Sequence, residues 1–196
     1  RLIATSATYR QVSHTAHGTA SDVDNRYLWR QNPRRLQAEA MRDAVLATSG
    51  KLNFKAGGSG YRDFKYTETY APIYRYITPD TPDLWRRSIY RFVVRTTPHE
   101  FLTILDCPDP ANLTPKRLTT TTPLQALTLS NNPFMLTQVG YFAERLKQDA
   151  SAKTADQIDR AFRLALSRQP TPAEAKAALQ TVRDKGLFAL CLALLN

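Results

Sequence analysis

The sequence predicts a mainly α-helical α+β domain that includes a small, antiparallel sheet. Helix starts led by proline or threonine recur through the second half of the chain, and a tyrosine-rich stretch with few helix-forming residues precedes them. The composition, 42% hydrophobic and 22% charged, is ordinary for a globular protein. We expect one domain over residues 1–196, with residues 51–96 inserted as the sheet and residues 97–196 forming the helical part.

The first strong helix is predicted between Asn32 and Gly50, after a short helical end at residues 2–9. Asn32 can cap this helix, Pro33 suits its first turn, and Gly50 can end it. Apolar residues at helical spacing would form its buried face, namely Leu36, Ala40, Met41, Ala44, Val45 and Ala47.

Residues 51–96 contain a glycine-rich turn followed by two strand-like segments. The turn, AGGSGY, lacks the GK[ST] ending and the strand-loop-helix context of phosphate-binding loops, so we interpret it as a surface turn. Residues 61–77 are rich in tyrosine and residues 85–95 are β-branched and aromatic, which predicts strands. Alternate side chains of a strand share a face, which would align Arg87, Arg91 and Arg95.

The rest of the chain is predicted to be helical because helix-start signals repeat along it. In a capping box, a threonine accepts a backbone N–H and a glutamate or glutamine three residues later reaches back. Such boxes begin at Thr97, Thr122, Thr154 and Thr171, and Asn132 precedes a further helix start at Pro133.

Three of these helices have apolar faces that repeat at helical spacing. We expect helices over about residues 133–147, 155–167 and 172–185, the last of them ending at Gly186. The first of the three would bury Met135, Val139, Phe142 and Leu146. The final apolar run, LFALCLALLN, is predicted to begin a further buried helix, since about ten residues are too few to span a bilayer.

The charge of the chain favours anionic partners. Its net charge is +10, from 27 basic and 17 acidic residues, which suits nucleic acid, acidic polysaccharide or a membrane surface. Arginine binds carboxylate, sulfate and phosphate through paired hydrogen bonds. The anion-binding candidates are Arg86, Arg87, Arg91, Lys116 and Arg117. The alternative, which we favour, is that such arginines form structural pairs with Asp83, Asp106 and Asp109.

Metal ligation has weak support in this sequence. Asp106, Asp109 and Asn112 offer oxygen ligands for calcium, but the EF-hand spacing is absent and such residues commonly form turns and caps. The histidines at 14, 17 and 99 form no zinc pattern with Cys107 and Cys191. We therefore expect neither a metal nor a cofactor in this chain.

No catalytic motif is recognisable, so no catalytic residues are assigned. The GxSxG nucleophile elbow is absent, and His14 and His17 lie in a polar loop without a third partner that could be named. A CxxCH haem-attachment motif is absent as well.

Several stretches resemble a planctomycete-specific domain of unknown function that ends long, exported, multidomain proteins. The matching stretches are RLIATSATYRQ, NRYLWRQNPRRLQAEAMRDAVLATSG, RRSIYRFVVRTTPHEFLTILDCPDP, TTTTPLQALTLSNNPF and RAFRLALSRQPTPAEA. The resemblance implies a periplasmic or extracellular location and often a cytochrome c-like domain upstream, which would hold any haem. It also implies that the chain is a fragment, incomplete at both ends.

These observations favour a non-catalytic binding or scaffold module that contacts neighbouring domains, an anionic glycan or a haem-bearing domain. One alternative is a hydrolase of sulfated or acidic polysaccharide, in which Asp106 and Asp109 would converge across a cleft. The other is nucleic-acid binding, suggested by the net charge and by tyrosines beside Arg75, although the export implied by the resemblance disfavours it.

Overall fold

The computed structural model describes residues 1–13, 22–78, 80–150 and 153–196. This part of the chain divides into two compact units, residues 1–36 and residues 37–196. Helices and a two-stranded antiparallel sheet make up its regular structure, which confirms the predicted mainly α-helical α+β class.

Among the described residues of the first unit, helix α1 (Leu2–Thr5) is shorter than the predicted helical end. Asn32 does not start a helix, contrary to the prediction. Its Oδ1 atom instead accepts a hydrogen bond of 3.1 Å from Nδ2 of Asn25, which also donates to the carbonyl of Arg30. The side chain expected to cap a helix therefore stabilises this loop.

The second unit begins with helix α2 (Ala38–Ser49), which ends where the sequence predicted. Gly50 takes the left-handed conformation (φ 80°), and the N–H of Lys51 reaches back to the carbonyl of Leu46 at 2.9 Å. The buried face was predicted only in part, because Ala40 and Ala47 are exposed and Leu36, which is also exposed, lies before the helix. The residues that α2 buries are Ala38, Arg42, Val45, Leu46, Thr48 and Ser49.

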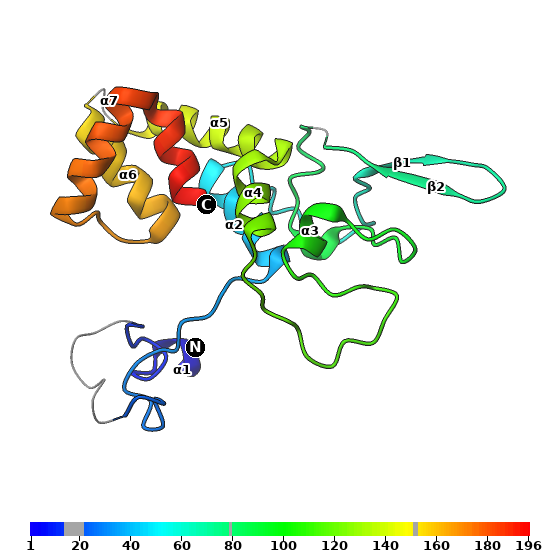
Figure 1. Cartoon of the computed structure of the whole chain (residues 1–196), viewed down its shortest axis with the longest axis horizontal. Helices are drawn as coiled ribbons and strands as arrows, with labels where there is room; N and C mark the ends of the chain where they lie inside the picture. The colour runs from blue at the N-terminus through cyan, green and yellow to red at the C-terminus, as the bar shows by residue number, and fades with distance from the viewer. Residues whose placement is uncertain (14–21, 79, 151–152) are drawn as a thin grey trace. The chain divides into compact units, whose positions relative to one another are not determined.

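The sheet is a single hairpin of β1 (Phe64–Thr67) and β2 (Ile73–Tyr76), in which Phe64 pairs with Tyr76. Figure 1 shows this hairpin projecting away from the helices of its unit. Both strands lie within the strand-like segment predicted at residues 61–77.

The second predicted strand, residues 85–95, was wrong. A short 3₁₀ helix, η1 (Ser88–Tyr90), lies there, flanked by two isolated bridges. The cause is a contact that local propensity does not reveal: the backbone N–H and the hydroxyl of Ser88 both donate to Oδ1 of Asp43 on α2, each at 2.7 Å. The segment consequently turns toward α2, and its arginines do not share one face.

Five helices follow, and their starts test the capping predictions. The capping boxes of Thr122 and Thr171 form as predicted, and the Asn132 side chain accepts from the N–H of Phe134. The boxes predicted at Thr97 and Thr154 were wrong, because the residues at the N-cap positions are His99 and Lys153, and neither forms a side-chain cap. The helices are α3 (Glu100–Ile104), α4 (Pro123–Asn131), α5 (Pro133–Asp149), α6 (Thr154–Leu166) and α7 (Pro172–Leu195).

Helix α7 contains the predicted break at Gly186, whose backbone (φ 84°, ψ 171°) is not helical. The final apolar run continues as helix beyond this break and buries Leu187, Leu190 and Cys191. No helix among the described residues combines the length and apolar character needed to cross a membrane.

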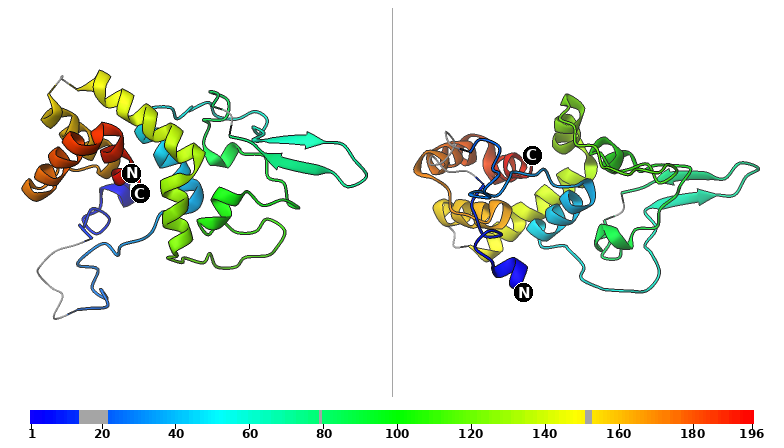
Figure 2. Two further views of the ribbon diagram at one scale, coloured as in Figure 1. Left: turned by 45° about the horizontal axis from the view of Figure 1, so that its top comes forward. Right: turned by 90° about the horizontal axis from the view of Figure 1, so that it is seen from below.

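Two hydrophobic clusters hold the second unit together, and α5 contributes to both. In one, Val139, Phe142 and Leu146 of α5 pack with apolar residues of α6 and α7. In the other, Met135 of α5 packs with residues of α2, α3 and α4. Figure 2 shows α5 running between these groups of helices. The four residues predicted to be buried on α5 are each fully buried, as the helical spacing indicated.

Candidate ligand-binding site

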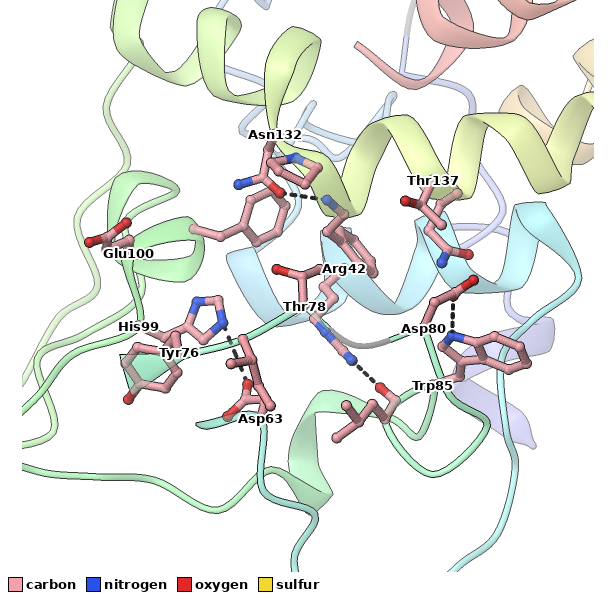
Figure 3. Close-up of a pocket in the computed structure, with 16 residues that line it drawn as sticks. Arg42, Asp63, Tyr76, Thr78, Asp80, Trp85, His99, Glu100, Asn132 and Thr137 are labelled. Carbon is pink, nitrogen blue, oxygen red and sulfur yellow. Dashed lines mark hydrogen bonds and ion pairs between the residues drawn. The ribbon is translucent and has the colours of Figure 1, made fainter. Parts of the chain in front are cut away.

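A cavity of about 280 Å³ lies where α2, α3 and the start of α5 meet the segment from Tyr76 to Trp85. Figure 3 shows the side chains that surround it. This volume is just below the range of about 300–1,000 Å³ that is usual for small-molecule sites. The wall consists of Arg42, Asp63, Tyr76, Ile77, Thr78, Asp80, Leu84, Trp85, His99, Glu100, Phe101, Asn132, Pro133, Phe134, Thr137 and Gln138.

Aromatic rings form much of this wall. Phe101 and Phe134 pack edge to face with ring centroids 5.5 Å apart, which joins α3 to the first turn of α5. Tyr76 and Trp85 supply two further rings from the ends of the connecting segment. The rings supply apolar surface, and the wall also holds carboxylates, the amides of Asn132 and Gln138 and threonine hydroxyls.

Arg42 is the most buried cation of the wall, and the backbone fixes its position. Its guanidinium donates to the carbonyls of Leu84 at 2.5 Å and Arg86 at 2.9 Å. It also lies 5.5 Å from the centroid of the Phe134 ring. These carbonyl acceptors explain why an arginine occupies the buried face of α2: they satisfy its donors where an apolar side chain was expected.

The charges on the wall are mainly negative. The wall includes three carboxylates, those of Asp63, Asp80 and Glu100, and one guanidinium, that of Arg42, and Asp63 is also paired with Arg91. His99 adds no charge at neutral pH, because burial, reinforced by the nearby positive charge of Arg91, lowers its pKa to about 4. Acidic groups thus line part of this cavity, although the net charge of the chain is +10.

Asp63, Arg91 and His99 form a buried polar cluster beside the cavity. Nε of Arg91 donates to Oδ2 of Asp63 at 2.8 Å, and Nε2 of His99 lies 3.4 Å from the same oxygen. The imidazole packs on Tyr76 with ring centroids 4.6 Å apart. Figure 3 shows His99 and Asp63 pointing toward each other across the cavity wall.

This cluster also contains buried polar atoms without a hydrogen-bond partner. They are Oδ1 of Asp63, Nη2 of Arg91, Nδ1 of His99 and the hydroxyl of the neighbouring Tyr61. Burial raises the pKa of Tyr61 to about 12, so its hydroxyl stays protonated. An unsatisfied buried polar atom costs about 1–3 kcal/mol, and such atoms are few in folded proteins. Four such atoms lie beside one cavity, and this place is therefore the candidate site.

A second cavity, of about 200 Å³, lies on the other side of Tyr76 and His99, which line both cavities. Its rim holds an ion pair in which the guanidinium of Arg117 donates to both carboxylate oxygens of Glu39, at 2.7 and 3.0 Å. Sγ of Cys107 lies 3.6 Å from Glu39 Oε1, and burial together with that carboxylate raises the pKa of Cys107 to about 11. The thiol is therefore protonated at neutral pH and a poor nucleophile.

The predicted anion-binding residues do not gather at one site. Arg91 and Arg117 both line the second cavity, where their partners are Asp63 and Glu39. Lys116 is exposed on the loop beside Arg117.

The other two candidates lie around the glycine-rich turn and α2. The guanidinium of Arg86 is directed to the carbonyls of Lys55, Gly57 and Ser59 at 2.6–3.2 Å, which fixes the turn. Arg87 is 57% exposed and lies 3.5 Å from Asp43. The paired arginines therefore use acceptors other than the three aspartates expected from the sequence.

The predicted calcium ligands form hydrogen bonds within their own loop. The carboxylate of Asp106 accepts from the N–H and the hydroxyl of Thr120 at 2.8 and 2.7 Å. That of Asp109 accepts from the N–H of Ala111 and the amide of Asn112 at 2.9 and 2.7 Å. Within the described ranges, no group of three or more histidine, cysteine, aspartate or glutamate side chains is arranged to hold a metal ion. His14 and His17 lie outside the described residues.

Sequence reasoning missed the residues that build the cavity. Arg42 carried a signal, because position 42 shares a helical face with Ala38 and Val45, although it was not assigned to the apolar stripe. No local sequence pattern identifies Asp63 and His99 as site residues, since they are 36 residues apart in the sequence and come together only in the folded chain.

Fold and cavity together define a mainly α-helical domain with a polar, ligand-sized site. The chain matches, over residues 1–182, the model of the PSD1 family, described as a protein of unknown function (DUF1553), and it belongs to this family. No curated protein and no solved structure matches the chain. The resemblance seen in the sequence is thereby confirmed at the level of a domain of unknown function.

Proposed function

We propose that this domain is a non-catalytic binding module and that its larger cavity binds a sugar unit of a glycan. The observation that supports the proposal is the combination of four aromatic rings with carboxylates, an amide and threonine hydroxyls around one cavity of about 280 Å³. A sugar ring has an apolar C–H face that packs on aromatic rings, and its hydroxyls both donate and accept hydrogen bonds.

The wall charges favour a neutral or positively charged sugar over an acidic one. Carboxylates at Asp80 and Glu100 would repel sulfate or uronate groups, and the donors of Arg42 already serve backbone carbonyls. The carboxylate of Asp63 is already paired with Arg91. The anionic glycan expected from net charge alone is therefore not the ligand proposed for this cavity.

The setting of the module is also part of the proposal. We propose, from the resemblance to domains of exported, multidomain proteins, that it acts in the periplasm or outside the cell, where polysaccharide is available. Neighbouring domains of the same polypeptide, including a haem-bearing domain upstream, would then be its partners in the chain.

A direct binding experiment tests the proposal. The chain is titrated with neutral oligosaccharides in a calorimeter, alongside variants of its two tryptophans. Trp85→Leu removes a ring from the cavity wall and should weaken binding at least tenfold, whereas Trp29→Leu, in the first unit, should leave it unchanged. Absence of binding across neutral, amino and acidic oligosaccharides would refute the proposal.

One observation favours a second candidate, a glycan hydrolase. Nε2 of His99 lies 3.4 Å from Asp63, so the carboxylate orients the imidazole, and its buried Nδ1 has no partner within the protein. This orientation resembles that of a general base, but its pKa of about 4 makes His99 a weak one. Hydrolysis would consume one water and create one new reducing end for each bond broken. Incubation of the chain with an oligosaccharide that it binds distinguishes the two candidates. If new reducing ends form with the parent chain but not with His99→Gln, the domain is a hydrolase. If no new reducing ends form, the domain is a binding module.

A further inference from the structure

The ammonium group of Lys51 lies between two aromatic rings at one end of the larger cavity. Nζ is 4.0 Å from the centroid of Tyr141 and 5.1 Å from that of Trp85. The two rings are 6.0 Å apart and nearly perpendicular, with an interplanar angle of 72°. Two ring faces that converge on one cation form an aromatic cage, the arrangement by which proteins recognise ammonium groups.

Asp80 completes this cage as its negative group. Its Oδ1 accepts a hydrogen bond of 3.1 Å from Nε1 of Trp85, and its Oδ2 accepts one from the hydroxyl of Tyr141. These bonds hold the carboxylate beside both rings, as Figure 3 shows for Asp80 and Trp85. The geometry thus joins a carboxylate to two π faces, all of which attract positive charge.

The cage and the cavity share part of their walls. Asp80 and Trp85 line both, and Tyr141 lies on α5 one helical turn beyond Thr137, which also lines the cavity. A ligand seated in the cavity would therefore contact two of the groups that surround Lys51 Nζ.

We infer that the ligand of this cavity carries a free amino group, as an amino sugar does, and that this group displaces Lys51 from the cage of Asp80, Trp85 and Tyr141. The inference rests on the proposed sugar-binding function and specifies its ligand. Lys51 follows the left-handed turn at Gly50 and reaches the cage through four flexible methylene groups, so it can swing out to solvent.

The cavity wall favours an amino sugar over a lysine side chain of a partner protein. The ammonium group would enter the cage, and the ring hydroxyls would meet the carboxylate of Asp63, the amide of Asn132 and the hydroxyl of Thr137. The ammonium group of a lysine side chain would also fit the cage. Its methylene carbons, however, would leave these polar groups without hydrogen-bond partners.

The experiment uses the Trp29→Phe chain, in which Trp85 is the remaining tryptophan and reports on the cage by fluorescence. It is titrated with glucosamine oligomers, with matched N-acetylated oligomers and with a lysine-rich peptide. The free amine should bind at least tenfold more tightly than the acetylated form, and this preference should vanish above the pKa of the amine. Lys51→Met, which removes the competing cation, should tighten binding of the amine two- to fivefold.

Two variants complete the design. Asp80→Asn should abolish the preference for the amine while retaining binding of the acetylated oligomer. Lys65→Met, on the exposed hairpin strand, is the matched lysine control and should change nothing.

The outcomes separate the inference from the function on which it rests. Equal affinity for free and acetylated oligomers overturns the inference and leaves the sugar-binding function in place. Equal or tighter binding of the lysine-rich peptide overturns the assignment to an amino sugar. If neither oligomer binds, both the inference and the proposed function are refuted.

Discussion

Nε2 of His99 lies 3.4 Å from Oδ2 of Asp63, and the same oxygen accepts a hydrogen bond of 2.8 Å from Arg91. Oδ2 of Asp63 thus contacts both the guanidinium of Arg91 and the imidazole of His99, while Oδ1 has no hydrogen-bond partner. The carboxylate would raise the pKa of His99, but burial and the charge of Arg91 outweigh it and hold that pKa at about 4. The pair is therefore an aspartate beside a neutral histidine.

This balance predicts that the domain loses stability in mild acid. The pKa of His99 is lower in the folded chain, about 4, than its ordinary value of 6.5, so the unfolded chain takes up the proton first as the pH falls. The contribution of His99 is complete above about pH 6.5 and is lost as the pH falls toward 4. We expect a loss on the order of 2–3 kcal/mol in the free energy of unfolding, measured by urea denaturation across this range.

His99→Gln is the control for that prediction. Glutamine can still donate a hydrogen bond toward Asp63 but does not titrate, so the variant should lose less stability between pH 6.5 and pH 4 than the parent chain. Other titrating groups contribute to both proteins, and the difference between the two curves isolates His99. Parallel curves would contradict the assigned pKa.

Arg42 should be required for folding stability as well as for the shape of the cavity. Arg42→Ala leaves the carbonyls of Leu84 and Arg86 without a donor, and we expect it to cost about 3–5 kcal/mol in chemical denaturation. Arg42→Lys should recover little, because a single ammonium group cannot reproduce the guanidinium fork.

A matched substitution on the hairpin provides the comparison. Arg75 is exposed on β2, and Arg75→Ala should change stability by no more than about 0.5 kcal/mol. Similar effects of the alanine substitutions at the two positions would show that the buried contacts of Arg42 contribute nothing specific.

The sequence could predict those elements that are fixed by local signals. Helix α5 begins at Pro133 because Asn132 caps it and the proline fits its first turn, and its apolar spacing identified the four buried residues. Gly50 and Gly186 each interrupted a helix where expected, because a left-handed or extended glycine cannot continue one. Such features depend on residues within a few positions of one another.

The failures concern contacts between distant segments. Residues 85–95 have strand propensity, but the two bonds from Ser88 to Asp43 turn them toward α2. The cavity likewise draws its polar groups from five separate segments, so neither Asp63 nor His99 could be recognised from its neighbours in the sequence. For the same reason the sequence could not show that Arg87, Arg91 and Arg117 pair with acidic residues on distant segments.

Two glycine-to-alanine substitutions should have opposite effects. Gly140 lies inside α5 with open space around its Cα, so Gly140→Ala should stabilise the chain by about 0.5–1 kcal/mol. Gly186 has φ 84°, so Gly186→Ala should destabilise by about 1–2 kcal/mol despite equally open space. Thermal unfolding tests both, and shifts of Tm in the same direction would contradict the backbone argument.

The two cysteines should react slowly while the chain is folded. Burial raises the pKa of Cys191 to about 12, and burial together with the charge of Glu39 raises that of Cys107 to about 11, so little thiolate exists at pH 8. Ellman's reagent should therefore label the native chain at least tenfold more slowly than the chain in denaturant. Glu39→Gln should speed labelling of Cys107 and leave Cys191 unaffected, because only Cys107 is close to that carboxylate. Native labelling as fast as that of free cysteine would show that Cys107 is an accessible, reactive thiol.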